Sequence, residues 1–137
     1  MALPRIVIVD DSPTIRRMVR MSLASTPNAT FVEAGSGLEA LEQISLGPVA
    51  LMVLDLNMPD IHGLEVLKFV RRHPAYRGLP VIVLTTRGDE VSRLAAAEAG
   101  ATVYLTKPFV PQVLADHAQT LLGGVSTPAE SRNRVGS

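Results

Sequence analysis

The fold is decided by the stretch Leu51-Met52-Val53-Leu54-Asp55-Leu56-Asn57-Met58-Pro59-Asp60-Ile61-His62-Gly63. Four apolar residues lead directly into an acid, and a short apolar run without polar alternation predicts a strand buried on both faces, as in parallel sheets. Pro59 and Gly63 interrupt the pattern, so the strand is expected to end near Asp55. Open α/β sheets carry their chemistry at the carboxyl ends of central parallel strands, which makes Asp55 a candidate for more than a helix cap.

Short apolar runs of the same kind recur along the chain and alternate with segments of helical periodicity. Further strands are expected over residues 6–9, 30–34, 81–84 and 103–106. Ser12 and Pro13 predict the start of the first helix, and Gly100 predicts the end of an Ala-rich helix over residues 87–99. The other three helices follow from apolar repeats within residues 38–44, 64–70 and 110–121. Five βα units in strict alternation predict a parallel sheet with helices on both faces.

Composition narrows the possible functions. The chain has 137 residues, of which 47% are hydrophobic and 19% charged, so one globular domain is expected, over residues 4–123, and a disordered tail or linker over residues 124–137. Thirteen basic and thirteen acidic residues cancel, which gives no electrostatic reason to expect nucleic acid or a membrane as partner. Cysteine is absent, which excludes disulfides and thiolate metal sites. No signal peptide and no apolar run of ~20 residues is evident, so a cytoplasmic protein is expected.

Five polar side chains follow or end the predicted strands: Asp10, Asp11, Asp55, Thr85 and Lys107. All strands of a parallel sheet end at the same edge, so these residues are expected to meet there. Three clustered carboxylates repel each other unless a cation lies among them, and oxygen ligands favour a hard ion such as Mg²⁺. Lys107 and Thr85 are expected to contact a phosphoryl group, and Asp55 to act as its nucleophile through an acyl phosphate.

These residues and their order resemble a response-regulator receiver domain of bacterial two-component systems, of the chemotaxis-protein type. The match extends over roughly residues 4–122. The resemblance implies a flavodoxin-like, doubly wound (βα)5 fold with the five-stranded parallel sheet in the order 2-1-3-4-5. It rests on Asp10-Asp11, Asp55-Leu56-Asn57-Met58-Pro59 with Gly63, Thr85, and Tyr104-Leu105-Thr106-Lys107-Pro108-Phe109.

The resemblance also implies the roles at the site. Asp55 accepts the phosphoryl group from a histidine kinase, and Lys107 contacts the phosphoryl oxygens, with the peptide bond to Pro108 in the cis form. The cofactor is Mg²⁺, which Asp11 binds directly and Asp10 through water. The main-chain carbonyl of Asn57 and Asp55 itself complete the metal ligands.

The output implied by the resemblance is a switch built from Thr85 and Tyr104. The Thr85 hydroxyl moves to the phosphoryl group, and the Tyr104 ring, in the middle of the fifth strand, moves inward. A downstream protein then binds the face made by the fourth helix, the fifth strand and the last helix. The module is expected to be a monomer or weak dimer whose only chemistry is its own phosphorylation and dephosphorylation. A phosphate sink, or a receiver cut from a larger regulator or hybrid kinase, are the alternatives within the family.

Three other functions are disfavoured by the same residues. A phosphatase of the haloacid-dehalogenase type needs an acid two residues after its nucleophile, where this chain has Asn57. An FMN carrier needs a neutral first turn, and this one is acidic. The segment 35–40 matches the pattern G-x-G-x-x-A but follows the second strand rather than the first, which argues against a dinucleotide site. Thr86 stands where receivers usually have a small residue, and its bulk is expected to narrow access to Asp55.

Overall fold

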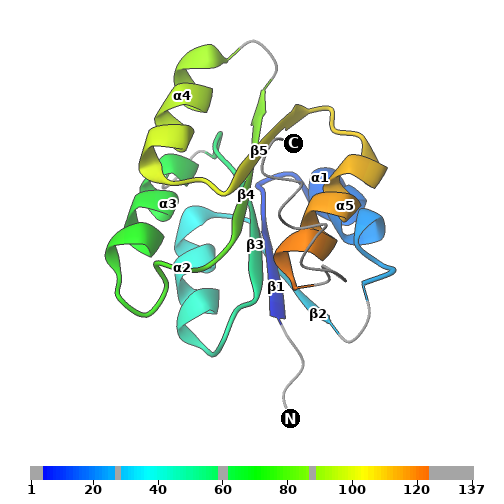
Figure 1. Ribbon diagram of the computed structural model, residues 1–137, viewed down its shortest axis with the longest axis horizontal. Coiled ribbons are helices and arrows are strands. Elements are labelled where there is room, and N and C mark those ends of the chain that lie inside the picture. The colour runs from blue at the N-terminus through cyan, green and yellow to red at the C-terminus, as the bar shows by residue number, and fades with distance from the viewer. Residues whose placement is uncertain (1–4, 27–28, 59–61, 87–88, 124–137) are drawn as a thin grey trace, which may run out of the picture.

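The computed structural model describes residues 5–26, 29–58, 62–86 and 89–123. Five strands and five helices alternate along these residues (Figure 1). The strands are β1 (Arg5–Val9), β2 (Thr30–Ala34), β3 (Leu51–Asp55), β4 (Val81–Thr86) and β5 (Val103–Lys107). The helices are α1 (Pro13–Ser22), α2 (Gly37–Ser45), α3 (Gly63–Arg72), α4 (Glu90–Ala99) and α5 (Pro111–Leu121).

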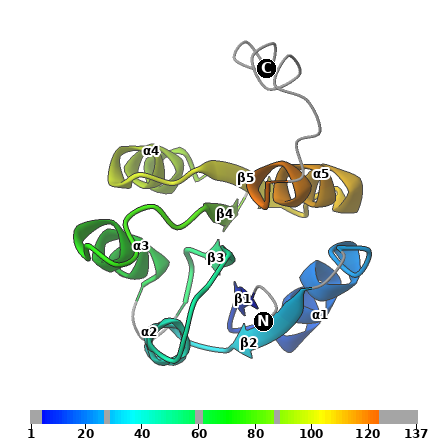
Figure 2. The ribbon, with the colours of Figure 1, turned by 60° about the horizontal axis from the view of Figure 1, so that its bottom comes forward.

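The strands form one parallel sheet in the order β2-β1-β3-β4-β5, which confirms the predicted flavodoxin-like topology. Helices α1 and α5 cover one face of the sheet, and α2, α3 and α4 cover the other (Figure 2). β3 lies in the centre of the sheet, between β1 and β4, and all five of its residues are buried. The continuous apolar run is therefore explained by a strand that has a helical layer on each side.

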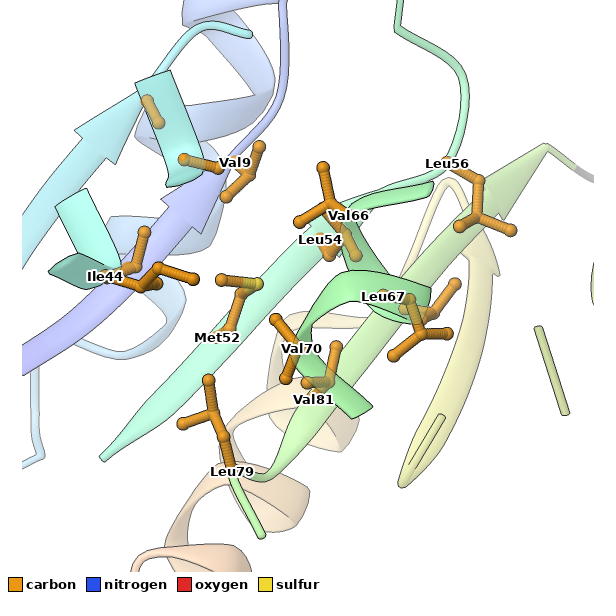
Figure 3. Close-up of a cluster of buried hydrophobic side chains, with 14 of the residues drawn as sticks. Val9, Ile44, Met52, Leu54, Leu56, Val66, Leu67, Val70, Leu79 and Val81 are labelled. Carbon is orange, nitrogen blue, oxygen red and sulfur yellow. The ribbon is translucent and has the colours of Figure 1, made fainter. Parts of the chain in front are cut away.

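Alternate residues of the strands supply two hydrophobic cores, one on each face. Met52 and Leu54 of β3 face α2 and α3, and they pack with Val66 and Val70 of α3 (Figure 3). Val53 belongs to the opposite core, which α1 and α5 cover. Both cores consist mainly of aliphatic side chains with no exposed surface, so they hold the central strand, and with it Asp55, from both faces.

The predicted helix boundaries hold with one correction. The Ser12 side chain accepts a hydrogen bond from the main-chain N–H of Ile15 and caps α1, and Gly100 ends α4 at a φ of 102°. The fourth helix begins at Glu90 rather than at the predicted residue 87, because the Asp89 side chain accepts a hydrogen bond from Ser92 N–H and caps the helix there. Residues 87 and 88 lie outside the described part of the chain.

Two further expectations concern the fifth strand and the end of the chain. Tyr104 is the second residue of β5 and lies opposite Val83, so the expectation of a mid-strand position is only approximate. The predicted tail over residues 124–137 lies outside the described residues. Within the ranges that are described, no helix has both the length and the apolar character needed to cross a membrane.

Candidate functional site

The carboxyl ends of four neighbouring strands bring the predicted site residues together. Asp10 follows β1 directly, Asp55 is the last residue of β3, and Lys107 is the last residue of β5. Thr85 lies one residue before the end of β4, and the strand register aligns Asp55 with Leu84. Asp10, Asp55 and Thr85 are the buried polar residues of the described chain, each at most 1% exposed.

The two carboxylate oxygens of Asp55 differ in their surroundings. Oδ1 accepts hydrogen bonds from the main-chain N–H of Asn57 and from Lys107 Nζ, each at 3.1 Å. Oδ2 is buried and has no hydrogen-bond partner among the described residues. The Thr85 hydroxyl is likewise buried and unpartnered there. Buried polar atoms are normally satisfied, so these two atoms indicate that the site receives a polar group from outside.

Three acids form a cluster suited to a metal ion. One carboxylate oxygen from each of Asp10, Asp11 and Asp55 lies within 4.8 Å of the others. Asp11 is exposed, whereas Asp10 is buried and accepts a hydrogen bond on Oδ1 from Ser12 N–H at 2.9 Å. Asp10 Oδ2 forms no hydrogen bond in the described structure, and its closest cation is Lys107 Nζ at 3.5 Å. This donor set of oxygen atoms alone fits Mg²⁺, which needs few carboxylates and retains water.

The electrostatics follow from burial and from this crowding. Burial raises the pKa of Asp10, the Ser12 hydrogen bond opposes that rise, and the charge of Asp55 adds to it. Burial by itself lowers the pKa of Lys107, but the hydrogen bond and charge of Asp55, with the charge of Asp10, outweigh it and raise that pKa. Lys107 therefore remains a cation at neutral pH beside two buried carboxylates. A cation bound at this rim, the carboxyl edge of the sheet where Asp10, Asp55 and Lys107 lie, would relieve the repulsion between the acids.

Comparison with known proteins identifies the family. Residues 6–119 match the model of the response regulator receiver domain. The chain is 36% identical over 120 residues to the chemotaxis protein CheY homolog of Campylobacter jejuni, covering 87% of this chain and 92% of that protein. The chain belongs to the response regulator receiver domain family. The lysine–proline peptide bond of this receiver, Lys107-Pro108, is cis, as the resemblance implied.

Two further relatives differ in how much of their length the match covers. The structure of the chemotaxis response regulator CheY4 of Vibrio cholerae superposes with a TM-score of 0.77 at 32% identity, covering 87% of this chain and 98% of that one. The cyclic di-GMP phosphodiesterase response regulator RpfG of Xanthomonas campestris is 40% identical over 118 residues. That match covers 85% of this receiver but 31% of RpfG. Receivers thus occur in this family both as small proteins and as parts of longer ones.

The predicted switch residue Tyr104 belongs to β5, and its half-buried side chain contacts α4. Its hydroxyl is hydrogen-bonded to Arg93 Nη1, and Arg93 Cζ lies 5.0 Å from the centre of its ring. Arg93 also forms an ion pair with Glu90 at 2.8 Å. No pattern in the sequence pointed to Arg93, because only the packing of α4 on β5 brings it to Tyr104.

The Thr86 side chain forms a hydrogen bond near the site, in addition to the steric effect expected from its size. Its Oγ1 accepts a hydrogen bond of 2.8 Å from Asn57 Nδ2, and both side chains are exposed. Thr86 and Asn57 are 29 residues apart in the sequence, so no local sequence pattern predicts this contact. Asn57 lies two residues beyond the end of β3, and Thr86 is the last residue of β4.

The alternative sites receive structural explanations. Ser36 Oγ accepts a hydrogen bond from Glu39 N–H while Glu39 Oε1 accepts one from Gly35 N–H, so the glycine-rich segment caps α2 by a variant of the capping box in which the glutamate reaches the residue before the N-cap. Those donors are used within the helix start rather than directed at a ligand. His62 and His73 each accept a hydrogen bond from a main-chain N–H two residues ahead. These two histidines are thus explained by local turns.

Proposed function

We propose that this receiver is a phosphorylation-activated signalling module that takes a phosphoryl group on Asp55 from a histidine kinase in the cytoplasm, with Mg²⁺ as cofactor. The observation that carries the proposal is the buried, unpartnered Oδ2 of Asp55, whose Oδ1 accepts a hydrogen bond from Lys107 Nζ. The unpartnered Thr85 hydroxyl is buried near the end of the neighbouring strand β4. A carboxylate oxygen without a partner is available as a nucleophile, and Lys107 together with a bound Mg²⁺ would balance the charge of an anionic phosphoryl group beside the acids. The unit proposed to act in this way is residues 4–123.

The transfer step follows from the positions of these groups. Asp55 Oδ2 attacks the phosphorus atom of phospho-histidine, a P–O bond forms, the P–N bond breaks, and the kinase imidazole leaves with the bond's electron pair and takes up a proton. Lys107, which already contacts Asp55 Oδ1, compensates the negative charge of the phosphoryl oxygens. When bound by Asp10, Asp11, Asp55 and the Asn57 carbonyl, Mg²⁺ would supply further positive charge there.

The proposed output is a change in a protein-binding face made by α4, β5 and α5. Thr85 and Tyr104 lie on adjacent strands, and Arg93 links Tyr104 to α4. Exposed apolar side chains on this face favour a protein as partner rather than nucleic acid or a membrane: Val91, Leu94, Val110 and Val113. We propose a monomer or weak dimer without enzymatic activity on other substrates. The match to part of RpfG supports the alternative that this receiver serves a larger regulator.

The test is to incubate the protein with acetyl phosphate and Mg²⁺ and to measure its intact mass. One alkali-labile phosphoryl adduct is expected in the unmodified chain and none in Asp55→Asn. Chelation of Mg²⁺ is expected to suppress the adduct in the unmodified chain. An adduct that persists in Asp55→Asn would place the acceptor elsewhere, and no adduct in either chain would refute the proposed function.

A further inference from the structure

A hydrogen bond between two exposed side chains joins the residues after Asp55 to the end of β4. Asn57 Nδ2 donates to Thr86 Oγ1 at 2.8 Å. Because the register of β3 and β4 aligns Asp55 with Leu84, Asn57 and Thr86 each stand two residues beyond the last aligned pair. The side-chain bond thus continues the pairing of the two strands past the last backbone hydrogen bond, from Leu56 N–H to the Leu84 carbonyl.

Both ends of this bridge are anchored. The main-chain N–H of Asn57 donates to Asp55 Oδ1 at 3.1 Å, which fixes the backbone below the carboxamide. The main-chain carbonyl of Thr86 accepts a hydrogen bond from Asp89 N–H, and the Asp89 side chain caps α4. The bridge therefore joins the segment after β3 to the start of α4 at a defined position. An exposed pair without such anchors would exchange readily with water.

We propose that Thr86 is a positioning residue that prolongs the life of the phosphoryl group on Asp55 by holding the Asn57 carboxamide in this bridge. This inference rests on the proposed phosphorylation of Asp55. It concerns the rate of hydrolysis, in which a water oxygen attacks phosphorus, the P–O bond to Asp55 breaks, and the products are the Asp55 carboxylate and dihydrogen phosphate.

The geometry explains why the bridge opposes this reaction. Asp55 is buried, so water must reach the phosphorus from the solvent side, opposite the P–O bond that breaks. Asn57 lies two residues beyond Asp55, and its exposed side chain is joined there to that of Thr86. While Nδ2 donates to Thr86, the carboxamide is held in one orientation and is less free to turn and place a water molecule in line with that bond. Release of the carboxamide allows it to do so.

The experiment compares variants that separate the hydroxyl from the bulk of Thr86. Thr86→Val keeps the branched shape and removes the acceptor, whereas Thr86→Ser keeps the hydroxyl and removes the methyl group. Each protein is phosphorylated with acetyl phosphate and Mg²⁺ and desalted, and the adduct is followed over time by intact mass. Thr120→Val, at an exposed threonine near the far end of α5, is the matched control. Thermal unfolding verifies that each variant is folded.

Thr86→Val is expected to lose the adduct about fivefold faster than the unmodified chain, the scale of one neutral hydrogen bond. Thr86→Ser is expected to restore most of the lifetime, and Thr120→Val to leave it unchanged. In an Asn57→Ala background, which keeps the main-chain carbonyl, Thr86→Val is expected to add no further effect.

Three results would overturn the inference while leaving the proposed function intact. They are an unchanged lifetime in Thr86→Val, an equally short lifetime in Thr86→Ser and Thr86→Val, and a full Thr86→Val effect in the Asn57→Ala background. Absence of any adduct on the unmodified chain would instead refute the proposed function, and the inference with it.

Discussion

At the scale of single residues, Gly63 is the position where α3 begins directly against the backbone of β3. A Cβ atom at Gly63 would lie 2.1 Å from the carbonyl oxygen of Asp55 and 2.6 Å from Cα of Leu56. Both neighbours are main-chain atoms of a buried segment and cannot turn aside as a flexible side chain would. Glycine is therefore required here for the close approach of α3, which also brings Gly63 N–H within 3.2 Å of the Leu56 carbonyl.

Gly63→Ala is expected to lower the free energy of unfolding by about 3 kcal/mol, because α3 must move away from the strand that carries Asp55. The matched control is Gly78→Ala, since a Cβ atom at Gly78 has no neighbour within 4 Å. That control is expected to change the free energy by less than about 0.5 kcal/mol. Urea unfolding of both variants measures the difference, and equal midpoints would contradict the steric argument.

At the scale of elements, Arg71 ties α3 to three neighbouring segments. Its guanidinium donates to the main-chain carbonyl of Gly100 at 2.9 Å and to that of Leu79 at 2.7 Å. It donates further to the carbonyl of Arg77 and to the hydroxyl of Thr102. Burial lowers the pKa of Arg71, although the group stays charged at any physiological pH. One side chain thus fixes the end of α4, the connection from α4 to β5 and the connection from α3 to β4.

Arg71→Lys is expected to destabilise the protein by about 2 kcal/mol, because a single ammonium group cannot reach the carbonyls that the guanidinium serves together. Arg72→Lys is the matched control on the next residue, which is exposed, and it is expected to cost less than about 0.5 kcal/mol. Chemical denaturation measures both. Lysine keeps the positive charge, so a loss below about 0.5 kcal/mol in both variants would mean that Arg71 contributes through its charge and not through its several hydrogen bonds.

At the scale of the whole molecule, the proposed signal must travel from the rim to the face of α4, β5 and α5. Thr85 and Tyr104 lie on neighbouring strands. Tyr104 aligns with Val83, and Val83 and Thr85 are two residues apart on β4, so the side chains of Thr85 and Tyr104 point to the same face of the sheet, the one that α4 covers. Moving such an equilibrium from mostly inactive to mostly active requires the phosphoryl contacts to favour the active state by about 5.5 kcal/mol. The unpartnered Thr85 hydroxyl is the group through which part of that preference would act.

With a beryllofluoride mimic of the phosphoryl group, amide chemical shifts are expected to change along α4, β5 and α5 as well as at the rim. Thr85→Ala is expected to bind the mimic and to lose the distant changes, because the hydroxyl that links the rim to Tyr104 is gone. Thr106→Ala, at an exposed residue aligned with Thr85 on β5, is expected to keep them. Shift changes confined to the rim in the unmodified chain would support a phosphate sink instead.

The sequence by itself determined the sheet, its strands and the meeting of Asp10, Asp11, Asp55, Thr85 and Lys107 at one rim. Apolar runs mark buried strands, and parallel strands all end at the same edge, so the site required no knowledge of side-chain packing. The order of the strands came from the family resemblance and was confirmed. The start of α4 was predicted three residues too early, because Asp89 was not recognised as its N-cap.

Only the tertiary structure decided which exposed side chains meet around that site. Asn57 and Thr86 are joined across neighbouring strand ends, and Arg93 is joined to Tyr104 across a helix and a strand. Periodicity tells which face of an element a residue occupies, but a hydrogen bond between two elements depends on their register, their separation and the rotamers of both side chains. These quantities arise when the elements pack, and no local pattern in this chain encodes them.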